Sequence, residues 1–169
     1  MKLRWWYVIV FNFLLAALVI AGAALYVIHF KGWEKNSKTE KNVLVIRDAG
    51  SGKIYGKWTL EGSEEFAIEF IHSVNQSPVR EFYRAEGRMI RPTTVRFSSF
   101  GAGMRSDLED GQTMSREGDA LVISGFNASF RELNYIVGTV SDHLLIIKDQ
   151  SLSLRELCGR NAHINIYIK

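Results

Sequence analysis

The first thirty residues contain a long apolar run with no Asp, Glu, Lys or Arg. The run extends from Trp5 to Phe30 and is bounded by Arg4 and Lys31. A helix that rises about 1.5 Å per residue needs about 20 apolar residues to cross the hydrocarbon core of a bilayer. We therefore predict that residues 1–33 form a short cytoplasmic stub and a transmembrane anchor, so that the membrane lipid bilayer is the first expected partner.

The charged and aromatic residues that flank this run predict its orientation. Lys2 and Arg4 precede it, and the positive-inside rule places such charges on the cytoplasmic side. Trp5 and Trp33 lie where aromatic side chains meet the two membrane interfaces. We expect a single-pass protein of the plasma (inner) membrane whose C-terminal domain lies outside the cytoplasm.

A cleavable signal peptide is the alternative interpretation of the same segment. Ala21-Gly22-Ala23 resembles a small-residue cleavage site. The apolar run nevertheless continues past this site through Leu25 to Ile28, which a signal peptide does not require. The continuation favours an uncleaved anchor, and cleavage stays open as the alternative.

The charge balance and the cysteine count exclude several classes of partner and site. The chain carries 21 Lys and Arg against 18 Asp and Glu, and two of the basic residues are Lys2 and Arg4. The remainder is nearly neutral and has no basic cluster suited to a phosphate backbone, so we do not expect nucleic acid as a partner. Cys158 is the single cysteine, which excludes an internal disulfide and a multi-thiolate metal site. We expect neither a metal nor a cofactor.

Residues 43–169, which follow a polar linker at 34–42, show the alternation of apolar and polar side chains that is typical of half-buried strands. Turn signals recur about every eight to twelve residues, the spacing of a sandwich or barrel. We predict an extracytoplasmic all-β domain of about eight to ten strands, an antiparallel sandwich or barrel-like fold. The segment DQSLSLRELCG (149–159) has room for one helical turn.

Several strands have faces that the sequence assigns. We expect the inward side chains to be Ile54, Trp58, Leu60, Phe66, Ile68, Phe70, His72, Val74, Ile164, Ile166 and Ile168. The outward side chains are expected to include His163 and Asn165. Residues 101–119 are polar and glycine-rich by contrast. We predict that they form a long loop, and such loops in compact domains are usually functional or disordered.

The hairpin IHSVNQSPVREFY (71–83) places a histidine and a glutamate where core side chains belong. A four-residue loop, NQSP, would set His72 opposite Glu81 on the inner face and Glu69 opposite Arg84 on the outer face. The inner pair has two interpretations. It is either a buried polar pair that fixes the register, or part of a ligand-binding or catalytic pocket.

Further candidates for such a pocket are Ser73, Gly101, Gly103 and His143. Ser73 follows His72 directly, and the two glycines belong to an FGAG turn whose backbone N–H groups could face an anion. Glycines at a strand end more often mark a simple bend or bulge. His143 could complete a site if the fold brings it to the hairpin. No residue is assigned a catalytic or metal-binding role.

These motifs resemble one bacterial family. HSV at 72–74, Pro78-Val79 with Glu81, FSSFGAG at 97–103 and His143-Leu144 together are similar to the domain of unknown function 1850, over roughly residues 43–169. Ser77 stands before Pro78 where that family's pattern leads us to expect threonine. The resemblance implies that His72, Ser73, Glu81 and the 100–103 stretch belong to whatever site exists.

The same resemblance implies a setting for the protein. Members of the family are small exported or membrane-anchored proteins without an assigned activity. They are commonly encoded beside the permease and the solute-binding protein of tripartite, ATP-independent (TRAP) transporters of the TAXI type. The leading functional hypothesis is therefore a non-catalytic accessory or binding module of such a transporter, with the permease and the solute-binding protein as possible partners. The alternatives are an extracytoplasmic hydrolase that uses His72 and Glu81, and a structural protein of the cell envelope.

Overall fold

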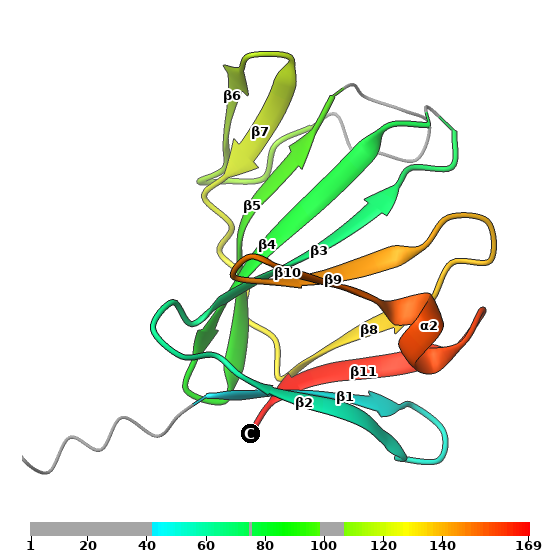
Figure 1. The fold of residues 1–169 in the computed structure, drawn as a ribbon. Coiled ribbons are helices and arrows are strands. Elements are labelled where there is room, and N and C mark those ends of the chain that lie inside the picture. The colour runs from blue at the N-terminus through cyan, green and yellow to red at the C-terminus, as the bar shows by residue number, and fades with distance from the viewer. Residues whose placement is uncertain (1–41, 75, 99–106) are drawn as a thin grey trace, which may run out of the picture. The chain divides into compact units, whose positions relative to one another are not determined.

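The computed structural model describes residues 42–74, 76–98 and 107–169 (Figure 1). These residues belong to one compact unit, Lys41–Lys169. The described part is all-β with one short helix, and it contains eleven strands, slightly more than the sequence predicts. The elements are β1 (Val43–Asp48), β2 (Ile54–Thr59), β3 (Glu65–Ile71), β4 (Pro78–Glu86), β5 (Met89–Phe97), β6 (Thr113–Glu117), β7 (Ala120–Ser124), β8 (Glu132–Ile136), β9 (His143–Ile147), β10 (Gln150–Ser153), α2 (Leu154–Cys158) and β11 (His163–Ile168).

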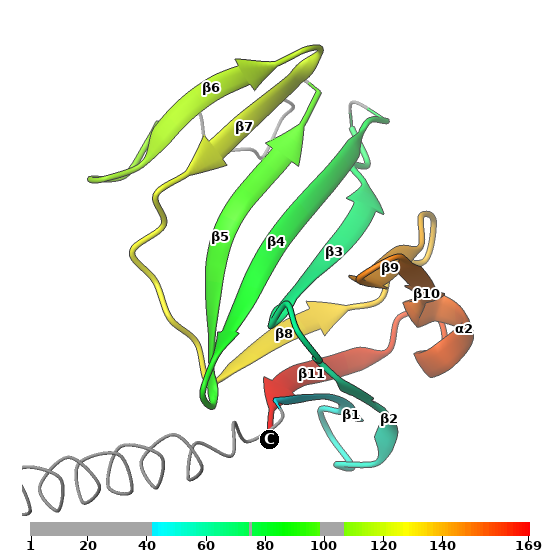
Figure 2. The ribbon, with the colours of Figure 1, turned by 60° about the vertical axis from the view of Figure 1, so that its left-hand side comes forward.

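The strands form two antiparallel sheets of unequal size. The small sheet has the order β2-β1-β11-β8, and the large sheet has the order β10-β9-β3-β4-β5-β7-β6. All pairings between neighbouring strands are antiparallel. In both views of the ribbon the small sheet lies against one part of the large sheet, and β6 and β7 extend away from it (Figures 1 and 2).

The inner faces of the two sheets meet in one apolar core. Ile46 of β1, Ile68 of β3 and Ile166 of β11 are fully buried there. The other buried members are Leu44, Leu60, Phe66, Tyr83, Ala85, Ile90, Leu133, Val137, Leu145, Ile147, Leu154, Ile164 and Ile168. Burying such side chains is the main favourable contribution to folding, at about 1.5–3 kcal/mol for each large one. The strands β6 and β7, both fully described, contribute no member to this cluster.

The segment that joins β7 to β8 carries the chain from the large sheet to the small one. Its residue Phe130 exchanges two backbone hydrogen bonds with Ile90 of β5, at 2.7 and 2.8 Å. At its start, Gly125 has a φ of +83°, and a Cβ there would lie 2.2 Å from the carbonyl oxygen of Gly111. Only glycine avoids both the strain and the overlap. The crossing is therefore fixed at both ends.

The helical turn predicted for residues 149–159 is confirmed as α2. Ser153 caps its N-terminus, because the Ser153 hydroxyl accepts a hydrogen bond from the Glu156 backbone N–H at 2.9 Å. Gly159 ends it with a φ of +97°. The helix places Leu154 in the core.

Three expectations about strands need correction. Ile54 is 46% exposed rather than inward, because the β1–β2 register shifts beside Arg47 and the bulge reverses the face at that end of β2. Asn165 is buried rather than exposed, and its amide donates to the side-chain oxygen of Asn134 on the neighbouring strand. Part of the predicted loop 101–119 is strand β6, whose side chains are all exposed and therefore show no alternation.

The segment predicted as a membrane anchor, Trp5–Phe30, lies outside the described residues. Among the residues that the structure does describe, no helix has the length and apolar character needed to cross a bilayer.

Candidate functional site

The β3–β4 hairpin has a different register from the one that the sequence suggests. The strand β3 ends at Ile71 and β4 begins at Pro78, and these two residues face each other. Glu81 consequently faces Ile68, not His72. The predicted pairing of His72 with Glu81 is wrong, because the two strands are joined between Ile71 and Pro78 rather than between Val74 and Val79. Val74, expected on the inner face, is 60% exposed in the loop.

Local hydrogen bonds define the loop between Ile71 and Pro78. The His72 N–H donates to the Ser77 carbonyl at 2.9 Å, and the Gln76 N–H donates to the His72 carbonyl at 3.0 Å. Gln76 adopts a φ of +51° within it. The imidazole of His72 turns back onto the loop, where its Nδ1 accepts from the Val74 N–H at 3.3 Å. A proline at the first position of β4 is suited to this arrangement, because its missing N–H is not needed there.

The shift moves the register by an even number of residues, so each side chain keeps its predicted face. On the outer face, Arg80 pairs with Glu69 at 2.6 Å and Arg84 pairs with Glu65 at 2.5 Å, in place of the predicted Glu69–Arg84 contact. Glu81 stays on the inner face.

Glu81 is held there by two tyrosines. Its Oε2 accepts hydrogen bonds from the hydroxyls of Tyr83, at 2.9 Å, and of Tyr135. The two hydroxyl oxygens lie 2.8 Å apart. Tyr83 is two residues further along β4, whereas Tyr135 belongs to β8 of the small sheet. The three side chains therefore form a polar bridge between the two sheets.

The environment keeps both tyrosines protonated. Burial, together with the negative charge of Glu81, raises the pKa of Tyr83 and of Tyr135 above the ordinary value of 10.0. Tyr83 also stacks on Phe66, with ring centroids 5.3 Å apart. Both hydroxyls thus remain hydrogen-bond donors to a carboxylate whose Oε2 they fix in place.

His143, the first residue of β9, lies beside this bridge. It faces Phe70 across the β3–β9 pair and stacks on that ring, with ring centroids 5.1 Å apart. The rings of His143 and Tyr135 meet in an edge-to-face arrangement with centroids 6.0 Å apart. The Gly138 N–H donates to His143 Nδ1 at 3.1 Å. Burial lowers the pKa of His143 below its ordinary 6.5, although Asp142 and Glu81 oppose this effect. The neutral ring therefore carries its proton on Nε2.

A pocket of about 650 Å³ opens on the inner face of the large sheet, next to the bridge. Figure 2 shows the strands β5 and β7, which contribute to its lining, side by side in the large sheet. Its lining comes from β3, β4, β5 and β7, from the β3–β4 loop and from the segments on either side of the β6–β7 hairpin. It comprises Phe70, His72, Val79, Glu81, Tyr83, Pro92, Val95, Phe97, Asp107, Glu109, Gln112, Ile123, Phe126, Ala128 and Phe130. His72 and Glu81 therefore line one pocket although they do not pair.

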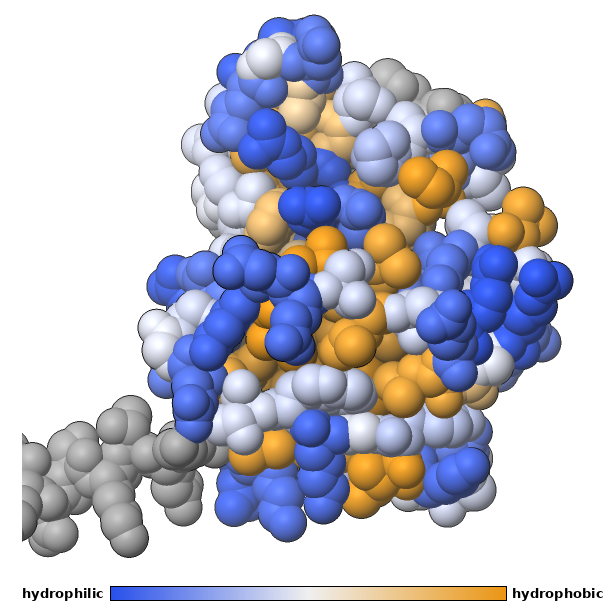
Figure 3. Space-filling model, viewed as in Figure 1, coloured by the Kyte–Doolittle hydropathy of each residue, from blue (hydrophilic) through white to orange (hydrophobic). Residues whose placement is uncertain are grey.

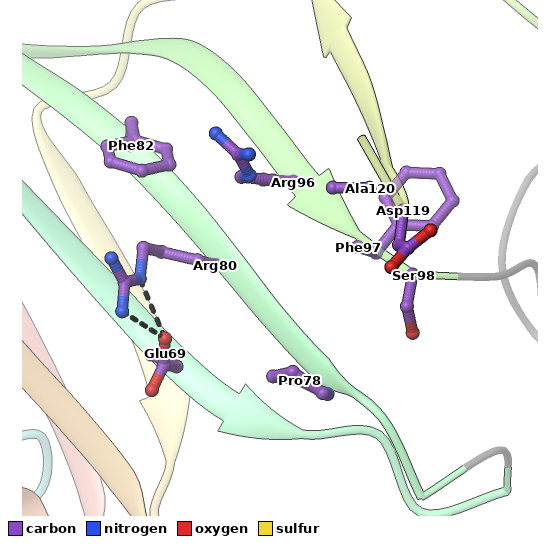
Figure 4. Close-up of a pocket in the computed structure, with 9 residues that line it drawn as sticks. All are labelled: Glu69, Pro78, Arg80, Phe82, Arg96, Phe97, Ser98, Asp119 and Ala120. Atoms are coloured by element: carbon purple, nitrogen blue, oxygen red, sulfur yellow. Dashed lines mark hydrogen bonds and ion pairs between the residues drawn. The ribbon is translucent and has the colours of Figure 1, made fainter. Parts of the chain in front are cut away.

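A second hollow, of about 360 Å³, lies on the opposite, outer face of the same sheet (Figure 4). Arg80 and Arg96 line it, and each forms an ion pair, with Glu69 and with Glu117. On the face shown in Figure 3, hydrophilic residues border separate hydrophobic areas. The inner pocket differs because most of its lining is apolar and its charges are acidic.

The remaining candidates from the sequence have different positions. Ser73 is exposed in the hairpin loop, where its carbonyl accepts from the Gln76 side chain at 2.6 Å, and it does not line the pocket. His143 contacts Phe70 of the lining without lining the pocket itself. Gly101 and Gly103 lie outside the described residues.

Sequence reasoning missed the two tyrosines. Tyr83 follows Glu81 at a spacing of two, so the alternation of β4 places it on the same face and could have identified it. Tyr135 gives no such signal, because the sequence contains nothing that predicts which strand of the other sheet faces Glu81.

The comparisons with known proteins identify the family. No curated protein and no solved structure matches the chain. A family model described as "Domain of unknown function (DUF1850)" matches residues 66–154, more than half of the 169 residues, and this stretch includes Glu81, Tyr83, Tyr135 and His143. The match is narrower than the 43–169 range of the motif resemblance, but it agrees on the family. The chain belongs to the DUF1850 family.

Proposed function

We propose that this protein is a non-catalytic binding module, anchored in the inner membrane with its β domain outside the cytoplasm, that serves a TAXI-type TRAP transporter. The observation that carries the proposal is the pocket on the inner face of the large sheet. Its volume of about 650 Å³ is within the range of about 300–1,000 Å³ that is usual for small-molecule sites. An apolar lining with a few fixed polar groups is also typical of such sites.

The setting of the module is supported by sequence. The apolar run Trp5–Phe30 supports an anchor, and Lys2 and Arg4 support a cytoplasmic N-terminus. The family resemblance supports the transporter association, because relatives of this kind are commonly encoded beside the permease and the solute-binding protein.

The geometry gives the alternative hydrolase less support than a binding role. General acid–base catalysis needs the two groups within reach of one reacting atom. His72 Nδ1 accepts a hydrogen bond from its own loop, and Glu81 Oε2 accepts two from tyrosines. No hydrogen bond joins these two described side chains. A binding role requires only that the pocket be preorganised.

A pull-down from detergent-solubilised membranes tests the transporter association. The full chain, tagged at its C-terminus and expressed at native level, should recover the permease or the solute-binding protein. The control bait keeps residues 1–42 and replaces the β domain with an unrelated one, and it should recover neither. Recovery of no transporter component by the full chain would overturn the proposed association.

Cysteine labelling on intact cells tests the topology. Cys158 is half-buried, and burial raises the pKa of its thiol to about 11, so it reacts slowly and can be replaced by alanine as a background. In that background Ser37→Cys should react with a membrane-impermeant thiol reagent before lysis, whereas Lys2→Cys should react only after lysis. The reverse pattern would mean the opposite orientation.

A further inference from the structure

We propose that the pocket on the inner face selects an organic cation: a protonated amine on an apolar body, with Glu81 Oε1 accepting its N–H. This inference rests on the proposed binding function and adds the ligand class to it. Three features of the described residues support it, namely the sign of the charges, the orientation of Glu81 and the nature of the walls.

The carboxylate that Glu81 contributes to the pocket has no lysine or arginine side chain beside it among the described lining residues. Among its described lining residues are three carboxylates, Glu81, Asp107 and Glu109, and one imidazole, His72, but no Lys or Arg. A concave site lined by one sign of charge concentrates ions of the opposite sign. The hollow on the outer face differs, because two arginines, Arg80 and Arg96, line it.

Glu81 presents a fixed acceptor to this pocket. Both tyrosine hydroxyls bind the same oxygen, Oε2. Oε1 accepts no hydrogen bond from any of the described residues. The two donors come from different sheets, so the carboxylate cannot turn without breaking the bridge. A ligand N–H can therefore bind Oε1 without the cost of ordering that side chain.

The walls suit the body of such a ligand. Four phenylalanines line the pocket, Phe70, Phe97, Phe126 and Phe130, with valine, isoleucine and proline between them. Aromatic faces stabilise a nearby cation as well as apolar carbon. A bare metal ion would gain nothing from these walls, and within the described part of the chain no group of three His, Cys, Asp or Glu is placed to hold one. An anion would be repelled by Glu81.

Isothermal titration of the purified full chain in detergent tests the ligand class with three probes of one shape. Phenylbutylamine carries the positive charge, phenylbutanol is neutral and phenylbutanoate is negative. We expect the amine to bind at least about tenfold more tightly than the alcohol, and the acid to bind more weakly than either. The preference for the amine should shrink as salt is added.

Two substitutions test whether Glu81 causes the preference for the amine over the alcohol. Glu81→Gln keeps the shape and one acceptor for the tyrosines but removes the charge, so the amine and the alcohol should bind about equally. Glu69→Gln is the matched control, because it removes the same charge from the outer face of the neighbouring strand. The control should keep the preference of the wild type.

The outcomes separate this inference from the proposed function. If the wild type binds the alcohol or the acid as tightly as the amine, the cationic class is wrong while the binding pocket stands. If Glu81→Gln keeps the full preference for the amine, Glu81 is not the acceptor and the inference fails. If none of the probes binds, the inference fails as well, and the pull-down still decides the association with the transporter.

Discussion

The inner face of the large sheet has two regions with the same alternation of side chains but different surroundings. At one end, Ile68 and Leu145 are fully buried beneath the small sheet. At the other end, Ile123 of β7 is only half-buried and lines the pocket. The alternation of apolar and polar residues along a strand therefore determines which face of the sheet each side chain lies on. Whether that face becomes core or pocket wall depends on how far the small sheet covers it. Glu81, Tyr83 and Tyr135 lie at the boundary between the two regions.

The largest expected effect tests this division directly. Leu145→Ala should lower the free energy of unfolding by about 2–5 kcal/mol, because it leaves a cavity in a close-packed core. Ile123→Ala in the pocket wall should cost clearly less, because that side chain already borders open space. Denaturant unfolding measures the loss in free energy of unfolding for each of the two variants. Equal losses would mean that the pocket end is packed like the core.

The second largest loss of stability is expected at the boundary between the two regions, where Tyr135 binds Glu81. Tyr135→Phe should cost about 1.5–3 kcal/mol, the usual value for a lost hydrogen bond to a charged group. In a double-mutant thermal-unfolding cycle with Glu81→Gln the two losses should not add, because the side chains touch. The same cycle with His72→Ala and Glu81→Gln should be additive, since those residues do not pair. Coupling between His72→Ala and Glu81→Gln would instead support the register predicted from the sequence, in which His72 faces Glu81.

A substitution at Gly125 tests how rigid the segment between β7 and β8 is. Gly125→Ala should cost more than Gly118→Ala, although both positions have positive φ. The strain of a left-handed backbone costs about 1–2 kcal/mol in either case. Only at Gly125 does the new Cβ also overlap the Gly111 carbonyl, whereas nothing lies within 4 Å at Gly118. Thermal unfolding should reveal the difference, and equal losses would mean that the crossing segment moves to accommodate the methyl group.

A pH effect should come from His143 beside the bridge. Its pKa is lowered in the folded state, so folding favours the neutral ring. The resulting stability is complete above the unfolded pKa of about 6.5 and decreases as the pH falls below it. Between about pH 7.5 and about pH 5.5 the wild type should therefore lose more stability than His143→Gln. Chemical unfolding at the two values compares them, and parallel losses would contradict the assignment.

The smallest effect is expected on the outer face. Arg84→Gln breaks the ion pair with Glu65, but both side chains are about half exposed, at 50% and 52%. Such surface pairs contribute about 0–1 kcal/mol and are screened by salt. A loss comparable to that of Tyr135→Phe would mean that the outer pairs are as important as the bridge, and the contrast between the two faces would disappear.

The β class and most strand faces could be predicted because they depend on local alternation. Phe66 and Ile68 are buried as expected, and the helical turn at Leu154–Cys158 follows from its cap. The hairpin register could not be predicted, because it depends on the hydrogen bonds that close the loop between His72 and Ser77. The bulge that exposes Ile54 has no signature in composition.

The site was predictable in part for the same reason. Glu81 was identified because a carboxylate on a core face is unusual whatever its partner is. Its real partners were not identified, because one of them, Tyr135, comes from the other sheet. The edge strand β6 was missed because both of its faces are exposed, so nothing distinguishes its pattern from that of a polar loop.

The small sheet joins the two ends of the domain in a way that affects how the chain reaches this fold. Its central strands are β1 and β11, and Val43 and Lys169 exchange backbone hydrogen bonds. This pairing closes a loop of almost the whole domain, and contacts of such long sequence separation make folding slow. Until His163–Ile168 has been synthesised, β1 and β8 each leave an edge open to other chains. Folding of the small sheet can therefore finish only after this last strand has been made, and truncation within His163–Ile168 should yield aggregation rather than a shorter domain.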